Sequence, residues 1–172
     1  MFKSLQVKLI TIFVLLVLAI MSVAGTFLVL QTYYFHCNSF KNDMNSVFTE
    51  DYISDLKNGL SQDESYVNKI ISEKYQTLGI DSCRSVYIVT INPETDALTD
   101  RMNFDTENFN KASSGEYGTK IDMTKEYLDY AIPVESENKT VIIYIRDTKE
   151  KINKEINKII ISKHRYYIRI SS

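Results

Sequence analysis

The chain has 172 residues, enough for one domain with a hydrophobic core and too few for two domains of ordinary size. Its composition, 44% hydrophobic with 5 Gly, 2 Pro and 2 Cys, excludes low-complexity, collagen-like and disulfide-scaffold proteins. The 20 basic and 22 acidic residues are unevenly distributed: residues 1–35 carry only two lysines, residues 36–148 are acidic and residues 149–172 are basic. The chain is therefore not a uniform soluble globule.

Residues 9–30, LITIFVLLVLAIMSVAGTFLVL, form an uncharged apolar run. As a helix the run is about 33 Å long, enough to cross a hydrocarbon core of about 30 Å, so we predict a transmembrane helix. Lys3 and Lys8 precede it and acidic residues follow it, which predicts that residues 1–8 are cytoplasmic and that the chain from residue 36 onward lies outside. A signal peptide cleaved after Ala24 is the alternative, but apolar residues continue beyond that point.

Two helical segments are expected before the first strand. Apolar residues recur near helical spacing from Phe40 to Leu60, so the transmembrane helix is expected to continue into this segment, with or without a break, and Gly59 is a plausible stop. Asp63 is a suitable N-cap for a second helix that closes at Gly79. The predicted apolar stripe of this second helix consists of Tyr66, Val67, Ile70, Ile71 and Tyr75.

The remainder of the chain favours strands. Ser85–Ile91 is β-branched and aromatic and predicts a central strand, and a polar run at 135–139 between two apolar runs predicts a hairpin. From Asp147 the apolar period changes to that of a helix, with Ile152, Ile156, Ile159 and Ile160 on one face. The other expected elements are a short strand at Ala97–Arg101, a short helix within Asn103–Ser114, a strand from Gly118 to Met123, and the hairpin strands Glu126–Val134 and Thr140–Arg146.

This order of elements predicts an α+β fold with a five-stranded antiparallel sheet of the PAS type, in its extracytoplasmic Cache version, with a long N-terminal helix on one face. The sensor domain is expected over residues 36–148, and an exit helix with a basic tail over residues 149–172. Its predicted core contains Val86, Ile88, Val89, Leu128, Ile132, Ile142 and Ile143.

Two stretches resemble the membrane sensor histidine kinases of the WalK (VicK) type. They are Leu5-Gln6-Val7-Lys8-Leu9, which runs directly into the apolar segment, and VIIYIRDTKEKINKEINKIIIS at 141–162. The resemblance implies a signal-sensing input domain whose last strand passes into a helix that enters a second membrane span. After residue 162, however, the chain carries Lys163, Arg165 and Arg169, which are costly in a bilayer. We expect a truncation or frameshift before the kinase core, with a native basic tail as the alternative.

The sequence contains no catalytic constellation, so we predict no enzymatic activity, no cofactor and no metal site. His36 and His164 lack metal-ligand spacing, and the isolated glycines do not form a phosphate-binding loop. Cys37 and Cys83 are predicted to be free thiols, because Cys37 is expected beside the bilayer and Cys83 at the first strand; a disulfide within or between chains is the alternative. The basic tail fits lipid headgroups or a solvated helix face better than nucleic acid.

A ligand pocket on the sheet would draw on aromatic and charged strand residues. Strand alternation places Tyr127 and Asp129 on one face, and Tyr144 with Arg146 on another. Arg101 or Arg146 could bind a carboxylate and Asp129 an amine, whereas the structural alternative is a cross-strand pair of Asp129 with Arg146. The candidate ligand-binding residues are Tyr87, Arg101, Tyr127, Asp129, Tyr144 and Arg146.

The leading functional hypothesis is a single-pass membrane input module of a two-component sensor histidine kinase. It would act as a homodimer, or as a mixed dimer with a full-length sensor kinase, and would respond to a small-molecule or cell-envelope ligand. The alternative is a free-standing anchored protein that binds a partner at the cell surface. An enzyme is the least favoured class.

Overall fold

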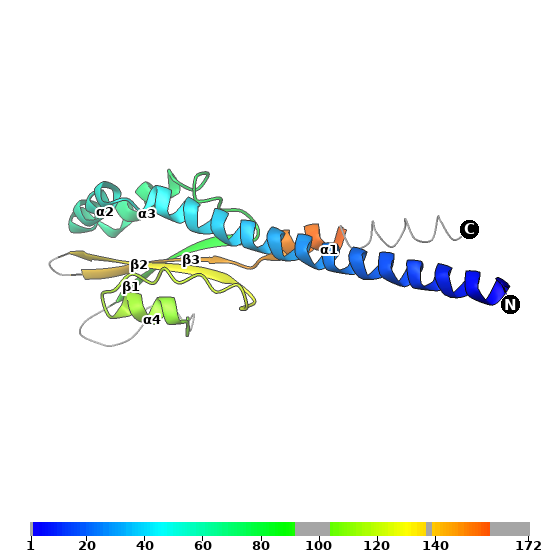
Figure 1. Cartoon of the computed structure of the whole chain (residues 1–172). Coiled ribbons are helices and arrows are strands. Elements are labelled where there is room, and N and C mark those ends of the chain that lie inside the picture. Colours follow the sequence, from blue (N-terminus) through cyan, green and yellow to red (C-terminus); the bar gives the residue numbers. More distant parts are fainter. Residues whose placement is uncertain (1, 92–103, 137–138, 159–172) are drawn as a thin grey trace.

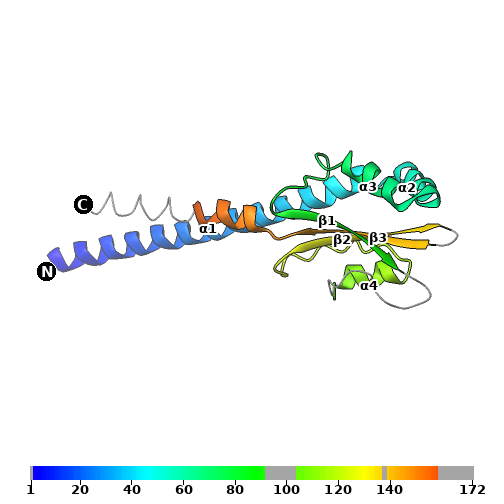
Figure 2. The ribbon, with the colours of Figure 1, turned by 180° about the vertical axis from the view of Figure 1, so that it is seen from behind.

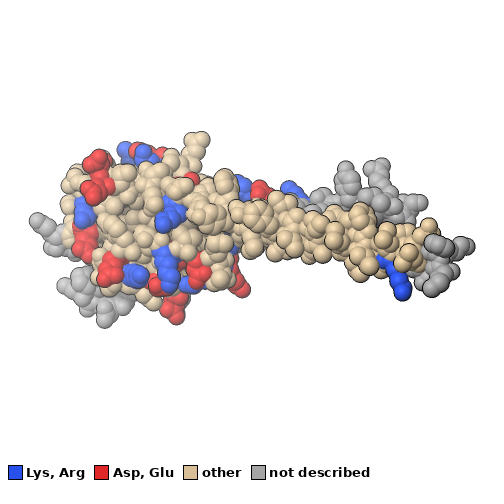
Figure 3. All heavy atoms as spheres, viewed as in Figure 1, with Lys and Arg blue, Asp and Glu red and all other residues tan. Residues whose placement is uncertain are grey.

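The computed structural model describes residues 2–91, 104–136 and 139–158 (Figure 1). Helix α1 (Phe2–Val47) contains 46 residues and is unbroken. At 1.5 Å per residue it is about 69 Å long. Its segment Leu5–Val47 is long and apolar enough to cross a membrane, and the most apolar 18-residue window of that segment is not covered by the rest of the described chain. Charged side chains gather on the globular part of the molecule and are nearly absent from the rod formed by α1 (Figure 3).

The second half of α1 packs against the rest of the domain, whereas the first half projects from it. Its inward face buries Cys37, Phe40, Met44 and Val47, which are spaced three or four residues apart as one face of a helix requires. The helix predicted from residue 40 to residue 60 is interrupted at Phe48 and Thr49. The side-chain oxygen of Thr49 accepts a hydrogen bond from the Tyr52 amide and thereby starts a new helix.

Helices α2 (Glu50–Gln62) and α3 (Glu64–Ser72) follow one another with Asp63 between them. The Asp63 amide donates to the Gly59 carbonyl at the end of α2, and its carboxylate accepts from the Ser65 amide at the start of α3. The predicted N-cap role of Asp63 is thus confirmed. The helix that it starts ends at Ser72 rather than at Gly79, and turns occupy most of the connection from there to Gly79.

Among the described residues the sheet has three strands, β1 (Arg84–Ile91), β2 (Leu128–Ser136) and β3 (Lys139–Asp147), in the order β1-β3-β2. Both pairings are antiparallel. Ser136 lies opposite Lys139, which confirms the predicted hairpin. The first strand lies beside the last, so the sheet connects the segment that leaves α3 to the segment that ends the domain.

The predicted five-stranded sheet is wrong for the described residues. The segment expected as a strand from Gly118 to Met123 forms a single bridge, between Gly118 and Ala131, and then turns at Met123 and Thr124. The Asp122 carboxylate accepts hydrogen bonds from the amide and hydroxyl of Thr124, so a local turn replaces further pairing. The strand expected at Ala97–Arg101 lies outside the described residues.

The sheet separates two apolar layers (Figures 1 and 2). Helices α1, α2 and α3 cover one face, where Leu128, Ile132 and Ile143 are buried. Helix α4 (Glu107–Ser113) covers the other face, where Val89 and Ile142 are buried. All five of these predicted core residues are buried, and Val86 and Ile88 are half-buried.

A helix at residues 150–158, called the exit helix below, follows β3 directly. It runs back beside α1 in both ribbon views, toward the end of the molecule at which α1 begins (Figures 1 and 2). Ile152 and Ile156 are buried, as the predicted apolar face requires, and the Tyr33 hydroxyl donates a 2.5 Å hydrogen bond to the Asn153 side-chain oxygen. Ile159 and Ile160 lie outside the described residues.

Candidate functional site

The predicted ligand residues that the structure describes lie close together at one side of the sheet. Asp129 lies opposite Arg146 and Tyr87 lies opposite Tyr144 in the strand register, so all four belong to the face that α4 covers. The prediction that Tyr144 and Arg146 occupy another face than Asp129 is therefore wrong, because residues directly opposite in adjacent strands share a face. Arg101 lies outside the described residues.

Tyr144 serves as the centre of the core on this face. Its side chain is fully buried, and its ring lies 4.5 Å from that of Phe104, 5.5 Å from that of Phe109 and 6.2 Å from that of Tyr87, measured between centroids. Burial and the nearby Asp129 carboxylate raise the pKa of Tyr144 far above its ordinary value, so its hydroxyl stays protonated. Two of the aromatic residues expected to bind a ligand, Tyr87 and Tyr144, thus pack with Phe104 and, for Tyr144, with Phe109 of the helix on this face.

The two charged members of the set have separate partners. The Asp129 carboxylate is buried and accepts a hydrogen bond from the Asn108 side chain at 3.0 Å, with the Tyr144 hydroxyl 3.4 Å away. The Arg146 guanidinium lies 4.0 Å from the centroid of the Tyr127 ring. Within the part of the chain that the structure describes, no salt bridge joins Asp129 to Arg146, although the expected cross-strand register is confirmed.

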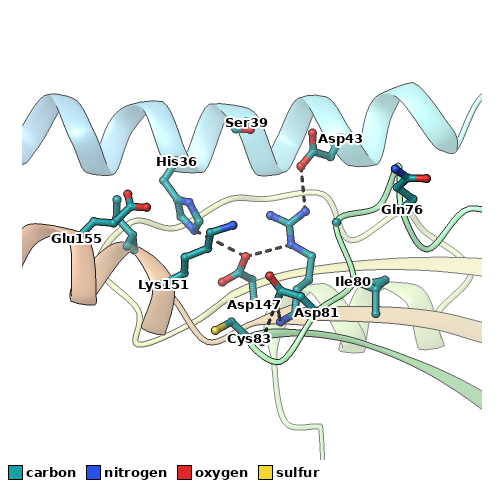
Figure 4. Close-up of a pocket in the computed structure, with 13 residues that line it drawn as sticks. His36, Ser39, Asp43, Gln76, Ile80, Asp81, Cys83, Asp147, Lys151 and Glu155 are labelled. Carbon is teal, nitrogen blue, oxygen red and sulfur yellow. Dashed lines mark hydrogen bonds and ion pairs between the residues drawn. The ribbon is translucent and has the colours of Figure 1, made fainter.

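A second cluster of charged residues lies where β3 ends against α1, and we call His36, Asp43, Arg84 and Asp147 the junction cluster (Figure 4). Arg84 starts β1 and Asp147 ends β3, and the two are register partners. The Arg84 Nε donates to Asp147 Oδ2 at 3.0 Å, and its Nη1 donates to Asp43 Oδ2 at 2.9 Å and to the Leu78 carbonyl at 2.6 Å. Arg84 therefore links α1, at Asp43, to the end of the β1–β3 pair at which β1 begins and β3 ends.

The ion pair between Arg84 and Asp147 is buried, so both charges need their partners. Arg84 is 7% exposed and Asp147 3% exposed, and the guanidinium carbon of Arg84 lies 4.8 Å from the centroid of the Phe40 ring. Breaking such a pair from one side leaves an uncompensated charge in a poorly solvated site. Burial alone raises the pKa of Asp147, but the adjacent His36 ring, the Lys149 amide and Arg84 outweigh it, so the net pKa is lowered and the carboxylate is ionised.

The backbone around the cluster is shaped to hold it. Gly79 adopts a φ of +64°, and a Cβ atom there would lie 2.7 Å from Arg84 Nη1. The Asp81 carboxylate accepts hydrogen bonds from the amides of Cys83 and Arg84 and fixes the start of β1. On the other side, Lys149 has a φ of +58°, its amide donates to Asp147 Oδ1, and its ammonium is bound by the carbonyls of Met123 and Lys125.

A pocket of about 370 Å³ opens at the junction cluster (Figure 4). This volume is within the range of small-molecule sites. Its walls come from α1, the connection at residues 76–83, the ends of β1 and β3, and the exit helix. The polar side chains that line it outside the Arg84–Asp147 pair include His36, Ser39, Asp43, Gln76, Asp81 and Lys151.

Both cysteines belong to this region of the molecule and both are free. Cys37 is 5% exposed and packs into the core on the α1 side of the sheet, and Cys83 lines the pocket. Cys37, expected beside the bilayer, is packed into this core, because α1 runs along the domain from Cys37 to Val47.

No sequence motif singles out the junction cluster. Arg84 and Asp147 are 63 residues apart, and their contact depends on the pairing of the first strand with the last, which local patterns do not specify. The only local signal was the position of a charged residue at each strand end. His36 lacks metal-ligand spacing and belongs to no motif in the sequence.

Comparison of this chain with protein families, with curated proteins and with solved structures finds no match. Among the described residues no group of three or more His, Cys, Asp or Glu side chains is arranged to hold a metal ion.

Proposed function

We propose that this chain is a membrane-anchored input module that passes a change in an extracytoplasmic domain to helices that lead to the membrane. The proposal includes a Cache or PAS-like domain and the role of a sensor domain for a histidine kinase of the WalK type. The single observation that carries it is the attachment of Asp147, the last residue of β3, to Asp43 of α1 through Arg84.

The arrangement of the elements supports this role. β3 is the central strand of the sheet and leads within three residues into the exit helix, which lies beside α1 (Figure 2). A displacement of β3 relative to α1 therefore has to act on the two helices that run toward the membrane end of the molecule. The Tyr33–Asn153 hydrogen bond joins these helices six residues beyond Asp147.

The charge distribution supports the proposed orientation. The apolar rod is preceded by lysines and followed by an acidic domain, which favours a cytoplasmic N-terminus. Protease added to intact protoplasts should then degrade the region 36–148 and leave the span. Protection of that region would contradict the orientation.

The signalling role is tested with a chimeric kinase. Residues 1–158 of this chain are joined to the second membrane span and kinase core of a WalK-type kinase, and autophosphorylation is measured in membrane vesicles. Asp147→Asn and Asp43→Asn should each change the rate at least about twofold, because they release the contact between β3 and α1. Glu150→Gln on the exit helix is the matched control, since Glu150 pairs only with the exposed Lys154 in the described structure and its loss should leave the rate unchanged.

Equal rates in the parent and both junction variants, with each variant folded, would contradict an input role. A free-standing anchored binding protein would then be the better description. In that case the α4 side of the sheet, where Arg146 has a buried Nε without a hydrogen-bond partner in the described structure, is the first surface to probe for a partner.

A further inference from the structure

His36 faces the junction cluster with a polar atom that the described structure does not satisfy. Its Nε2 is buried and lacks a hydrogen-bond partner, although Asp147 Oδ2 lies only 3.6 Å away. That distance is too long for a charge-assisted hydrogen bond, for which about 2.7–2.9 Å is usual. The ring thus lies within ion-pair distance of the carboxylate but makes no normal hydrogen bond to it.

The charges at the junction explain what a proton on His36 would do. Asp43 and Asp147 bring two negative charges and Arg84 brings one positive charge. With a neutral His36 one negative charge of the cluster stays uncompensated, and the Asp147 side chain is 5% exposed, so water relieves it little. A protonated imidazole would supply the missing positive charge and a donor directed at Oδ2.

The other ionisable groups around the ring do not provide that charge. The Lys149 ammonium is directed to the carbonyls of Met123 and Lys125 and forms no ion pair with Asp43 or Asp147 in the described structure. On the exit helix the pocket is lined by Lys151 and Glu155, which are exposed and of opposite sign. Asp81 lies on the β1 side of the pocket and adds negative charge, and the thiols Cys37 and Cys83 are the remaining ionisable neighbours.

We propose that His36 forms a contact that depends on protonation. Protonation of its ring closes the 3.6 Å gap to Asp147 and joins α1, at His36, to the point where β3 leads into the exit helix. Histidine is the side chain whose ordinary pKa places a charge change between about pH 5 and 8. Acidification outside the membrane would therefore tighten the junction, and alkaline conditions would loosen it. Only the signalling consequence depends on the proposed function; the contact itself does not.

Amide hydrogen exchange tests the contact in the full chain, reconstituted in lipid nanodiscs. Exchange of residues 147–158 is measured at pH 8 and pH 6 in the wild type and in His36→Gln, and the ratio of the two proteins at each pH removes the intrinsic pH dependence of exchange. We expect the wild type to gain roughly threefold to tenfold protection over the variant at pH 6, since hydrogen bonds to charged groups are the strong ones. At pH 8 the two proteins should exchange alike.

Three further variants separate the proposed pair from other effects. His36→Lys carries a permanent charge and should protect residues 147–158 at both pH values. Asp147→Asn should remove the pH dependence, and His164→Gln, at the other histidine of the chain, should preserve it. A wild-type-to-variant ratio that is the same at pH 6 and pH 8, or a pH dependence that survives in Asp147→Asn, would overturn the proposal. If the exchange of residues 147–158 depends on pH but Asp147→Asn leaves the output of the chimeric kinase unchanged, the proposed function is refuted and the His36 contact is not.

Discussion

The Asn108 side chain of α4 reaches the sheet and donates to both the backbone carbonyl of Asp129, at 2.9 Å, and its carboxylate, at 3.0 Å. The same amide group also donates to the Lys120 carbonyl and accepts from the Lys120 amide. One buried side chain thus joins α4, β2 and the segment that bridges to β2 at Gly118. This residue, rather than the predicted ligand set, organises the polar part of that face.

Asn108→Ala should destabilise the domain by about 2–4 kcal/mol, because it leaves buried donors and acceptors unpaired next to a buried carboxylate. Urea unfolding in detergent micelles, followed by the near-ultraviolet circular dichroism of the tyrosines, measures the effect. Asn110→Ala is the matched control on the same helix: Asn110 is exposed and its contact to Asp105 is 3.4 Å, so a change below about 0.5 kcal/mol is expected. Equal losses in the two variants would contradict the role of Asn108.

Gly118→Ala should also be costly, for a steric reason. A Cβ atom at residue 118 would lie 2.1 Å from the Asn108 backbone oxygen, so the strand segment or α4 has to move. We expect a loss of about 1–3 kcal/mol, typical of overpacking. A melting midpoint within one degree of the wild type would show that the segment can shift away from α4 without cost.

Ile143→Ala should destabilise the domain by about 2–5 kcal/mol, since Ile143 is fully buried on the α1 side of the central strand. Ile88→Ala, on the neighbouring strand at the directly opposite position, is the control because Ile88 is only half-buried. The expected order of unfolding free energies is wild type, then Ile88→Ala, then Ile143→Ala. The reverse order of the two variants would place the core elsewhere.

The stability of the domain should depend on Asp147 in acid. Its pKa is lowered in the folded protein, so its contribution is present above about pH 4, the ordinary value for an unfolded Asp, and disappears as the pH falls through the folded value. The wild type should therefore lose its advantage over Asp147→Asn as the pH is lowered below about 4. Parallel stability curves for the two proteins over that range would exclude a lowered pKa.

If two α1 helices pair, a cysteine at residue 35 should crosslink them, and the native Cys37 should not. Phe35 is 75% exposed on α1, whereas Cys37 is 5% exposed and packed against the domain. Under mild oxidation in membranes, Phe35→Cys should give a disulfide-linked dimer in a Cys37→Ser background. The absence of this dimer, or an efficient crosslink through Cys37 in the wild type, would argue against pairing along this face of the stalk.

Elements with a local signal were predictable from the sequence, and those that depend on distant pairing were not. β1 follows from its β-branched run, the β2–β3 hairpin from a polar run between two apolar runs, and Asp63 from its capping chemistry, because these preferences act within a few residues. The break at Phe48 also had a local signal, Thr49 followed by Glu50 and Asp51, which the apolar spacing obscured. The junction cluster had only a charged residue at each strand end as a local signal, since its members come from three distant segments that only the folded sheet brings together.

In the proposed input module, the Phe48–Thr49 break is the point about which the uninterrupted helix α1 tilts. His36 lies 13 residues from Thr49 and Lys8 lies 41 residues from it, along one helix without interruption up to Val47. If the helix pivots at the break as a rigid body, a lateral movement at His36 becomes about three times larger at Lys8, because distance along a helix is proportional to residue number. A closure of less than 1 Å at the junction would thus become a displacement of roughly 2–3 Å at Lys8.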